Sequence, residues 1–241
     1  MVFTLFMNTR DHSQSEVQAE SMAVRARLAA RERLLAHIDQ HDAGGYSEEA
    51  FAELGQLVEV LRPLTAVPAP MDSAEKVEGR WDTLFAHFGA RHSAGKPKVH
   101  DSNLKVQSFN CFPAVPIRVE RICQEISRAG EAYNNVIDFL AADGVTRGLL
   151  IVHGRYREAA DNRQRFSVDF HQLELRPAAG LSEAALRAAL GFGAEEPLTV
   201  DLKPPRLHSD VVYLDDDLRI NVGSLGGLYV LRRSAAPPAS I

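Results

Sequence analysis

The sequence lacks any apolar run long enough to cross a bilayer, because a membrane-spanning helix needs about 20 consecutive apolar residues. The apolar opening, residues 1–7, is short and has no basic segment before it, which argues against a secretory signal peptide. Cysteine is also scarce: Cys111 and Cys123 are the only 2, too few for a disulfide scaffold or a cysteine zinc site. We therefore expect a soluble protein of a reducing compartment, the cytoplasm.

The sequence has no excess of positive charge either. Lysine and arginine total 27 against 32 aspartates and glutamates, which gives a net charge of -5 at pH 7. A weakly acidic chain has no general attraction to phosphate backbones, so we expect no nucleic-acid partner.

Motifs of catalytic or cofactor chemistry are missing as well. The sequence contains no G-x-S-x-G motif, no phosphate-binding loop and no dinucleotide fingerprint. His37 and His41 have the i, i+4 spacing of helical zinc ligands, but Ile38 stands where zinc proteases have a glutamate. The consecutive aspartates 215–217 lack the alternating spacing of a calcium loop. We expect no catalytic residues, no metal and no cofactor.

The first part of the chain has a helical pattern. Apolar residues recur at helical spacing from about Ser15 to the paired glycines 44–45, and again over residues 48–62. Ser47 is a candidate N-cap for the second helix, and Pro63 ends it. Residues 65–70 form a proline-rich, semi-rigid linker. The sequence thus predicts that residues 1–70 form a helical hairpin and a linker.

After Glu78 the period changes from helical to alternating, most clearly where Phe166, Val168 and Phe170 alternate with polar residues. Strands are predicted at residues 80–88, 104–109, 117–126, 133–140, 147–157, 164–175, 198–202, 210–214, 217–222 and 227–233. Short strands at close spacing predict a sandwich or a closed barrel, and a barrel can enclose a cavity lined by alternate residues. We predict a mainly β domain over residues 71–233 with one short helix at 182–190, and a disordered tail over residues 234–241.

The strand at 217–222 leaves its orientation open. Leu218 and Ile220 alternate with Arg219, so one of the two sets faces the interior of a barrel. An outward Arg219 would be an ordinary surface arginine, whereas an inward one needs a partner, with Asp169 and Asp217 as the candidate carboxylates. We predict the inward orientation, with the N-terminal helices covering Leu218 and Ile220.

The end of the chain resembles a known family. The segment VVYLDDDLRINVGSLGGLYVLRR at 211–233 is similar to the closing motif of the plastid lipid-associated proteins, also called plastid fibrillins. Segments similar to the family's other motifs precede it in the same order: LLAHIDQHDAGGYS at 34–47, LGQLVEVLRPLTAVPAP at 54–70, GRWDTLF at 79–85, RICQEI at 121–126, YNNVIDF at 133–139 and NRQRFSVDFHQLEL at 162–175. The resemblance covers residues 34–233. The abundance of arginine and alanine, without a transit peptide, indicates a bacterial member.

The resemblance implies a lipocalin-like antiparallel β-barrel preceded by a helical hairpin. It implies a non-catalytic protein that binds or organises a hydrophobic small molecule, namely a lipid, isoprenoid, carotenoid or quinone, in the barrel cavity. It also implies peripheral contact with a membrane surface, and it leaves the oligomeric state open. The residues expected to contact the ligand are Trp81, Asn134, Arg163, Phe170, Asp217, Arg219 and Tyr229.

Two other functions stay open at this point. One is an enzyme that acts on a small apolar substrate in the same cavity and uses Arg219 beside Asp217 or Asp169. The other is an interaction scaffold that docks partners on the N-terminal helices. An apolar lumen favours the carrier, close titratable groups favour the enzyme, and a filled barrel beside an exposed apolar helix face favours the scaffold.

Overall fold

The computed structural model describes residues 7–41, 45–87, 100–104, 110–203, 207–238 and 240. Helices α1 (Met7–His41) and α2 (Glu48–Leu61) come first, followed by the short turns η1 (Arg62–Leu64), η2 (Pro70–Asp72) and η3 (Ala74–Lys76). The strands are β1 (Gly79–His87), β2 (His100–Asn103), β3 (Pro116–Ser127), β4 (Ala132–Ala141), β5 (Arg147–Glu158), β6 (Arg165–Pro177), β7 (Thr199–Asp201), β8 (Leu207–Leu214), β9 (Leu218–Gly223) and β10 (Leu228–Arg233). Helix α3 (Glu183–Leu190) lies between β6 and β7.

The strands close into an antiparallel barrel. Their order is β1-β10-β9-β8-β6-β5-β4-β3, and β3 pairs back onto β1, so the sheet has no free edge around this ring. The short strands β2 and β7 add to β3 and β6 respectively. The predicted mainly β fold, a lipocalin-like antiparallel barrel after a helical hairpin, is therefore confirmed. Within the strand expected at 104–109, residues 105–109 lie outside the described part of the chain.

The two N-terminal helices begin and end where local chemistry allows. The Ser47 hydroxyl accepts a hydrogen bond from the Ala50 amide at 3.2 Å and caps α2, as predicted. Helix α1 begins at Met7, earlier than the expected start near Ser15. The sequence from Met7 to His41 contains neither glycine nor proline, so nothing in it breaks the helix before His41.

The helical hairpin covers one outer face of the barrel and forms a second apolar core with it. This core contains Ala30, Leu34 and Ile38 of α1, Leu54, Leu57, Val58 and Leu61 of α2, and Phe85, Val212, Tyr213, Leu218, Ile220 and Val230 of the strands. Burial of each such aliphatic side chain contributes roughly 1.5–3 kcal/mol. Leu218 and Ile220 thus face outward under the helices, as predicted, and the side chains between them must face the barrel interior.

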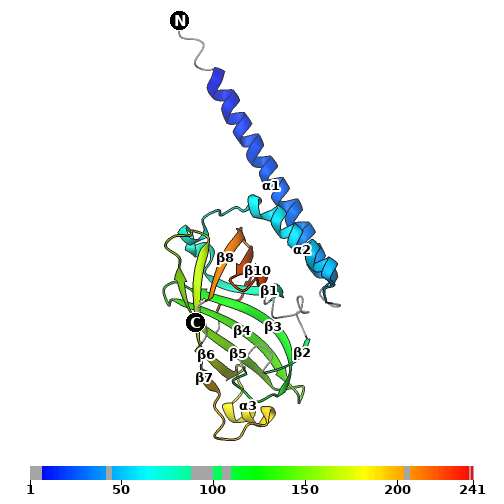
Figure 1. Cartoon of the computed structure of the whole chain (residues 1–241), viewed down its shortest axis with the longest axis vertical. Helices are drawn as coiled ribbons and strands as arrows, with labels where there is room; N and C mark the ends of the chain where they lie inside the picture. The colour runs from blue at the N-terminus through cyan, green and yellow to red at the C-terminus, as the bar shows by residue number, and fades with distance from the viewer. Residues whose placement is uncertain are drawn as a thin grey trace.

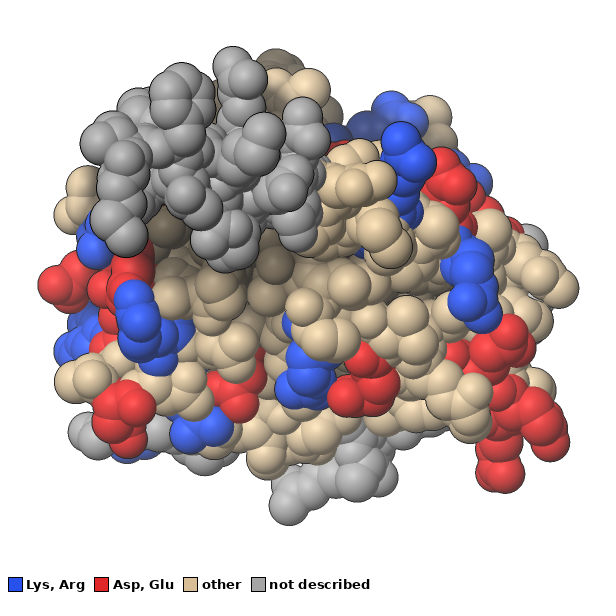
Figure 2. Space-filling view, turned by 90° about the horizontal axis from the view of Figure 1, so that it is seen from above, with Lys and Arg blue, Asp and Glu red and all other residues tan. Residues whose placement is uncertain are grey.

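The N-terminal half of α1 extends beyond the barrel (Figure 1). Met22 is 67% exposed on this part of the helix, and Leu28, further along, is 49% exposed. In the described part of the chain, no helix combines the length and the apolar character needed to cross a bilayer. Figure 2 shows basic and acidic side chains interspersed over much of the face seen from above, with several acidic side chains together at its lower right.

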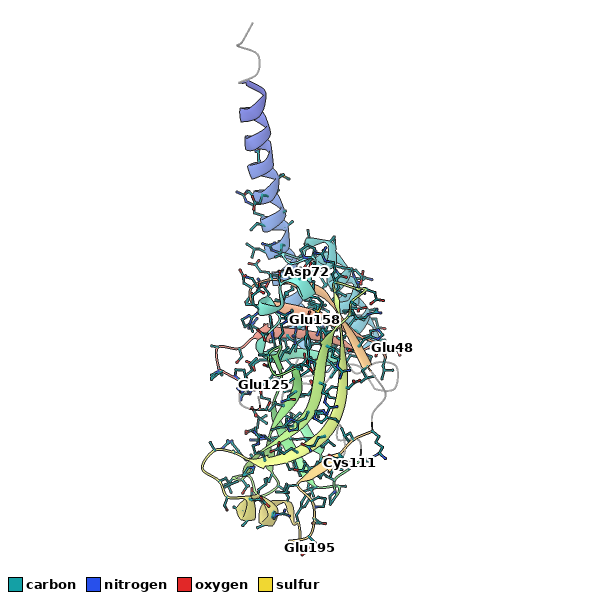
Figure 3. The ribbon with its side chains drawn as sticks, turned by 90° about the vertical axis from the view of Figure 1, so that its left-hand side faces the viewer. Glu48, Asp72, Cys111, Glu125, Glu158 and Glu195 are labelled. Atoms are coloured by element: carbon teal, nitrogen blue, oxygen red, sulfur yellow. The ribbon has the colours of Figure 1, made fainter. Side chains whose placement is uncertain are left out.

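The opposite end of the barrel is closed by α3. Leu186 and Leu190 of this helix are buried in the main core, which continues through the interior of the long strands. Ser182 caps α3 as expected, and Gly191 ends it with a left-handed φ of 68°. Figure 3 labels Glu48 at the end of the barrel that carries the hairpin and Glu195 at the end beyond α3.

The described residues of the C-terminal segment lie against the outside of the barrel. The Ser240 amide donates to the Glu125 carboxylate at 2.8 Å, and the side-chain amide of Asn134 donates to the Ser240 hydroxyl at 3.0 Å. Glu125 is fully buried here and faces the Arg80 guanidinium at 3.3 Å. The domain boundary at residue 70 and the disorder of the tail stay predictions.

Candidate functional site

The barrel interior contains a cavity of about 390 Å³. Its wall is largely apolar and comes from strands on both sides of the barrel: Ile122, Ile137, Val152, Val168, Phe170 and Leu207. Ser224 and Leu225, which belong to the β9–β10 turn and are exposed, also line it, so the cavity opens to the surface beside this turn. Its volume lies near the lower end of the ~300–1,000 Å³ range of small-molecule sites.

Polar side chains interrupt this apolar wall. The polar residues that line the cavity are Thr83, Asn110, Gln124, Tyr133, Asn135, His208, Ser209, Ser224 and Tyr229. Burial raises the pKa of Tyr229 to about 12 and the pKa of Tyr133 further, so both phenols are neutral at pH 7. The cavity can therefore enclose an apolar molecule and offer hydrogen bonds at a few fixed points.

Trp81 lies beyond the polar part of the cavity, away from the β9–β10 turn. Its side chain is fully buried, and its indole N–H donates to the Val77 carbonyl at 2.8 Å. The guanidinium carbons of Arg219 and Arg233 lie 4.7 Å and 4.2 Å from the centroid of the ring. Cations over an indole face are attracted by its negative quadrupole, so the ring holds both arginines. The predicted burial of Trp81 is confirmed.

Arg219 is fully buried, which confirms its inward orientation. Its Nη2 donates to the Gln124 side-chain oxygen at 2.6 Å, whereas its Nε and Nη1 have no hydrogen-bond partner among the described residues. The prediction that Asp217 or Asp169 pairs with Arg219 is wrong. Asp217 accepts from Arg31 at 2.7 Å outside the barrel, and Asp169 faces Arg157 at 3.9 Å.

The guanidinium of Arg233 is hydrogen-bonded to backbone carbonyl oxygens. It donates to the carbonyl of Glu78 at 2.8 Å, to that of Asp216 at 3.0 Å, and to that of Lys76. Burial lowers the pKa of both Arg233 and Arg219, and for Arg219 to about 10, which still leaves this guanidinium charged at pH 7. The inner end of the barrel is therefore electropositive.

A family model describes nearly the whole of this architecture. The PAP/fibrillin model matches residues 29–232, which span the C-terminal part of α1, all of α2 and the barrel almost to the end of β10. The chain belongs to the PAP/fibrillin family. The resemblance seen in the sequence motifs is thereby confirmed.

A protein from cucumber is similar to this chain in sequence. This chain is 24% identical over 216 residues to the chromoplast-specific carotenoid-associated protein of Cucumis sativus, an alignment that covers 79% of this chain. The alignment covers 62% of the cucumber protein, so this chain matches less than two thirds of that relative's length. No solved structure matches the chain.

The PAP/fibrillin motif residues fall into two groups in the structure. Phe170 and Tyr229 line the cavity, whereas Trp81 and Arg219 contact each other deeper in the barrel, behind the lining residue Gln124. The barrel brings these four residues into one interior, although they come from four different strands. Their role in ligand binding stays a prediction.

The other three motif residues lie outside the cavity. Asn134 faces outward between Tyr133 and Asn135 and bonds Ser240, Arg163 is paired with Asp72 on the surface, and Asp217 is paired with Arg31. The structure therefore does not bring them together with the first group.

Sequence reasoning missed several polar residues of the interior. Gln124, Tyr133 and Asn135 line the cavity, and Asn221 is fully buried with both side-chain amide atoms unpartnered among the described residues. One signal was available: Asn221 lies two residues after Arg219 and therefore shares its face of the strand. For Gln124, Tyr133 and Asn135, alternation alone left both faces of the strand open.

Proposed function

We propose that the barrel binds one hydrophobic small molecule of the lipid, isoprenoid, carotenoid or quinone class, and that it does so without catalysing a reaction. The observation that carries this proposal is the cavity of about 390 Å³ inside a closed barrel, with a mostly apolar wall and exposed lining residues in the β9–β10 turn. Enclosed apolar surface with few polar groups is what an apolar ligand needs to leave water. A cavity of this size holds a compact ligand, or one end of a longer ligand.

The cucumber relative supports the apolar ligand class, because its name describes it as associated with carotenoids. The shared family supports a common barrel, and the apolar cavity lies within the matched residues. The choice among lipid, isoprenoid, carotenoid and quinone is left to the binding experiment below.

The non-catalytic part of the proposal is supported by the arrangement of the titratable groups. The enzyme hypothesis required Arg219 beside Asp217 or Asp169, and both carboxylates are paired with other arginines. Burial raises the pKa of the Cys123 thiol to about 12, which leaves it unreactive at neutral pH. The titratable side chains among the described residues that line the cavity are Tyr133, Tyr229 and His208, and no carboxylate is among them. The two tyrosines are neutral phenols and offer hydrogen bonds rather than charge.

The experiment is a binding titration with a cavity-blocking variant. All-trans-retinol, a fluorescent isoprenoid, is titrated into the full chain, and its fluorescence is followed to saturation. Ala86 lines the cavity, so Ala86→Phe places an aromatic ring in it, whereas Ala184→Phe adds the same ring to an exposed site on α3. We expect one retinol per wild-type chain and an affinity that falls by about ten-fold or more in Ala86→Phe only, the equivalent of a lost apolar contact surface.

Two results would overturn the proposal. The first is the absence of saturable retinol binding by the folded wild-type chain, together with native mass spectra of freshly purified protein that show no bound lipid or isoprenoid. The second is equal affinity of the Ala86→Phe and Ala184→Phe variants, since the ligand would then bind outside the barrel.

A further inference from the structure

A buried charge that the described protein does not neutralise lies behind the inner end of the cavity, next to the lining residue Gln124. Arg219 is fully buried and protonated, yet its neighbours are the Trp81 ring, the Gln124 amide and the guanidinium of Arg233. The phenols of Tyr133 and Tyr156 lie near it as well, and burial raises the pKa of both, so at pH 7 neither supplies a negative charge. A buried arginine is normally paired with an anion, so a cation with only neutral and cationic neighbours is costly unless something else supplies the negative charge.

A second buried group at this end is also unsatisfied. Asn221 has no exposed surface, and both its Oδ1 and its Nδ2 lack partners among the described residues. The same holds for Nε and Nη1 of Arg219. Buried polar atoms are nearly always hydrogen-bonded in folded proteins, so a cluster of four unpartnered atoms on two neighbouring side chains indicates a missing partner.

These groups are arranged along one line that leads to the cavity. Arg219, Asn221 and Gly223 are spaced by two residues on β9 and share its inward face. Asn221 pairs with Tyr229 of β10, and both Tyr229 and Gly223 line the cavity. The path from Arg219 toward the β9–β10 turn therefore passes Asn221 and ends in the open part of the cavity.

Gln124 connects the arginine to the cavity from the other side. Its side-chain oxygen accepts from Nη2 of Arg219 at 2.6 Å, and the same residue lines the cavity beside Tyr133. Arg219 thus lies one side chain behind the cavity wall. A ligand group at this end would be held by Gln124, or would take the place of the Gln124 oxygen on the guanidinium.

We propose that Gln124 in the cavity wall, with Arg219 and Asn221 behind it, binds the carboxylate head group of an otherwise apolar, isoprenoid-like ligand. A carboxylate supplies the missing negative charge, and its two oxygens accept from more N–H donors than the single neutral oxygen of a hydroxyl or ether head. Apolar residues such as Ile137 and Val152 then enclose the adjoining hydrocarbon. This inference rests on the proposed function, because it specifies the chemistry of the ligand in that same cavity.

The test compares two probes that share one isoprenoid chain. All-trans-retinol ends in a hydroxyl and all-trans-retinoate in a carboxylate, so the ratio of their dissociation constants reports the head group alone. We expect the wild-type chain to bind retinoate about ten-fold or more tightly than retinol, the range of a charge-assisted hydrogen bond in a buried site.

The variants assign the preference to Arg219. In Arg219→Gln we expect the ratio of the two dissociation constants to fall to about one, because the counter-charge is lost. Arg232→Gln is the matched control, since Arg232 is exposed on the neighbouring strand β10, and it should keep the wild-type ratio. Asn221→Val, which keeps the charge and removes the amide, should lower the ratio about three-fold. Each variant is first checked for a cooperative melting transition.

The outcomes separate this inference from the proposed function. If the wild-type chain binds neither probe, the proposed function fails and takes this inference with it. If retinol binds saturably and retinoate no more tightly, the carboxylate site is refuted while the apolar carrier stands, and this result needs no variant. If folded Arg219→Gln keeps the retinoate preference, the assignment to Arg219 is refuted.

Discussion

Replacing Trp81 tests how the electropositive end of the barrel is held together. The indole has no exposed surface, donates a hydrogen bond to Val77 and carries the guanidinium groups of Arg219 and Arg233 within 4.7 Å and 4.2 Å of its centroid. Its removal takes away a large apolar side chain and the negative π face that both cations share. The two guanidinium groups are then left near each other without the ring.

The expected magnitude follows from these contacts. Truncation of a buried tryptophan to alanine costs about 3–5 kcal/mol of the free energy of unfolding. The lost cation–π contacts add about 0.5–2 kcal/mol each, although such terms are not strictly additive. The total approaches the ~5–15 kcal/mol stability of a typical domain, so Trp81→Ala is expected to be unfolded or barely folded at 25 °C.

The informative comparison is therefore Trp81→Phe against Trp81→Leu. Both variants lose the hydrogen bond from the indole N–H to the Val77 carbonyl, and only the phenylalanine variant keeps an aromatic face for the arginines. We expect Trp81→Leu to be less stable than Trp81→Phe by about 1–2 kcal/mol, measured by urea denaturation followed by far-ultraviolet circular dichroism. The same pair made in an Arg233→Gln background should differ by less, because one of the two cations is gone.

Equal stability of the two variants would show that the aromatic face does not hold the arginines. A difference that persists unchanged in the Arg233→Gln background would attribute it to side-chain volume instead. A Trp81→Ala chain that melts at the wild-type temperature would refute the role of Trp81 in the core altogether.

Two further predictions concern the outside of the barrel. Asp215 accepts hydrogen bonds from Arg31 at 2.9 Å and from the Tyr213 hydroxyl, and so holds α1 against the barrel. Asp215→Asn should therefore lower the free energy of unfolding by about 1.5–3 kcal/mol and speed proteolysis of α1. Unchanged proteolysis would contradict the role of Asp215 in docking this helix. Arg165 donates to Asp210 at 2.7 Å and 2.9 Å, which holds the pKa of this carboxyl below its usual value. The stability that this ion pair contributes is fully present above a pH of about 3.9, the pKa of an unfolded aspartate, and is lost as the pH falls through the lowered pKa of Asp210 in the folded state. In Asp210→Asn, the free energy of unfolding should therefore fall less on acidification, by up to about 1 kcal/mol. An unchanged acid limb in denaturation measured across pH would contradict this.

The sequence predicted the elements well because their signals are local. The Ser47 and Ser182 caps, the glycine after α3 and the alternation of Phe166, Val168 and Phe170 each depend on a few neighbouring residues. The early start of α1 was missed, because the expectation relied on the apolar stripe, whereas the chain before Ser15 continues the helix without a breaker.

The orientation of β9 was predicted correctly for a reason that is only partly local. Alternation shows that Leu218 and Ile220 share a face, but not whether that face is inside the barrel. The answer depends on the helical hairpin, because its apolar side chains cover these residues from outside. An amphipathic strand in a barrel with a covering layer can point its polar face inward, so the prediction needed the two helices as well as the strand.

The predicted site residues reach the barrel interior only where the assigned register is right. Asn134 was placed in the cavity, yet it faces outward and its neighbour Asn135 lines the cavity instead. Adjacent strand residues face opposite sides of a sheet, so an assignment that is off by one residue exchanges the interior for the surface. Because Asn134 and Asn135 are consecutive and identical, the alternation of polar and apolar residues does not show which of them faces the interior.

The partner of Arg219 is the part of the site that lay furthest from sequence reasoning. The nearby acidic residues were natural candidates, since Asp217 is only two positions away, but it lies in the turn before β9 and reaches the helix α1 instead. The observed partner, Gln124, is 95 residues distant and meets Arg219 across the barrel interior. An inward arginine is a property of one strand, whereas its neighbours depend on how the whole barrel closes. In the structure this arginine is paired with a neutral amide, and Asn221 beside it has no partner among the described residues. We therefore expect the ligand to supply the counter-charge, which the motif alone could not indicate.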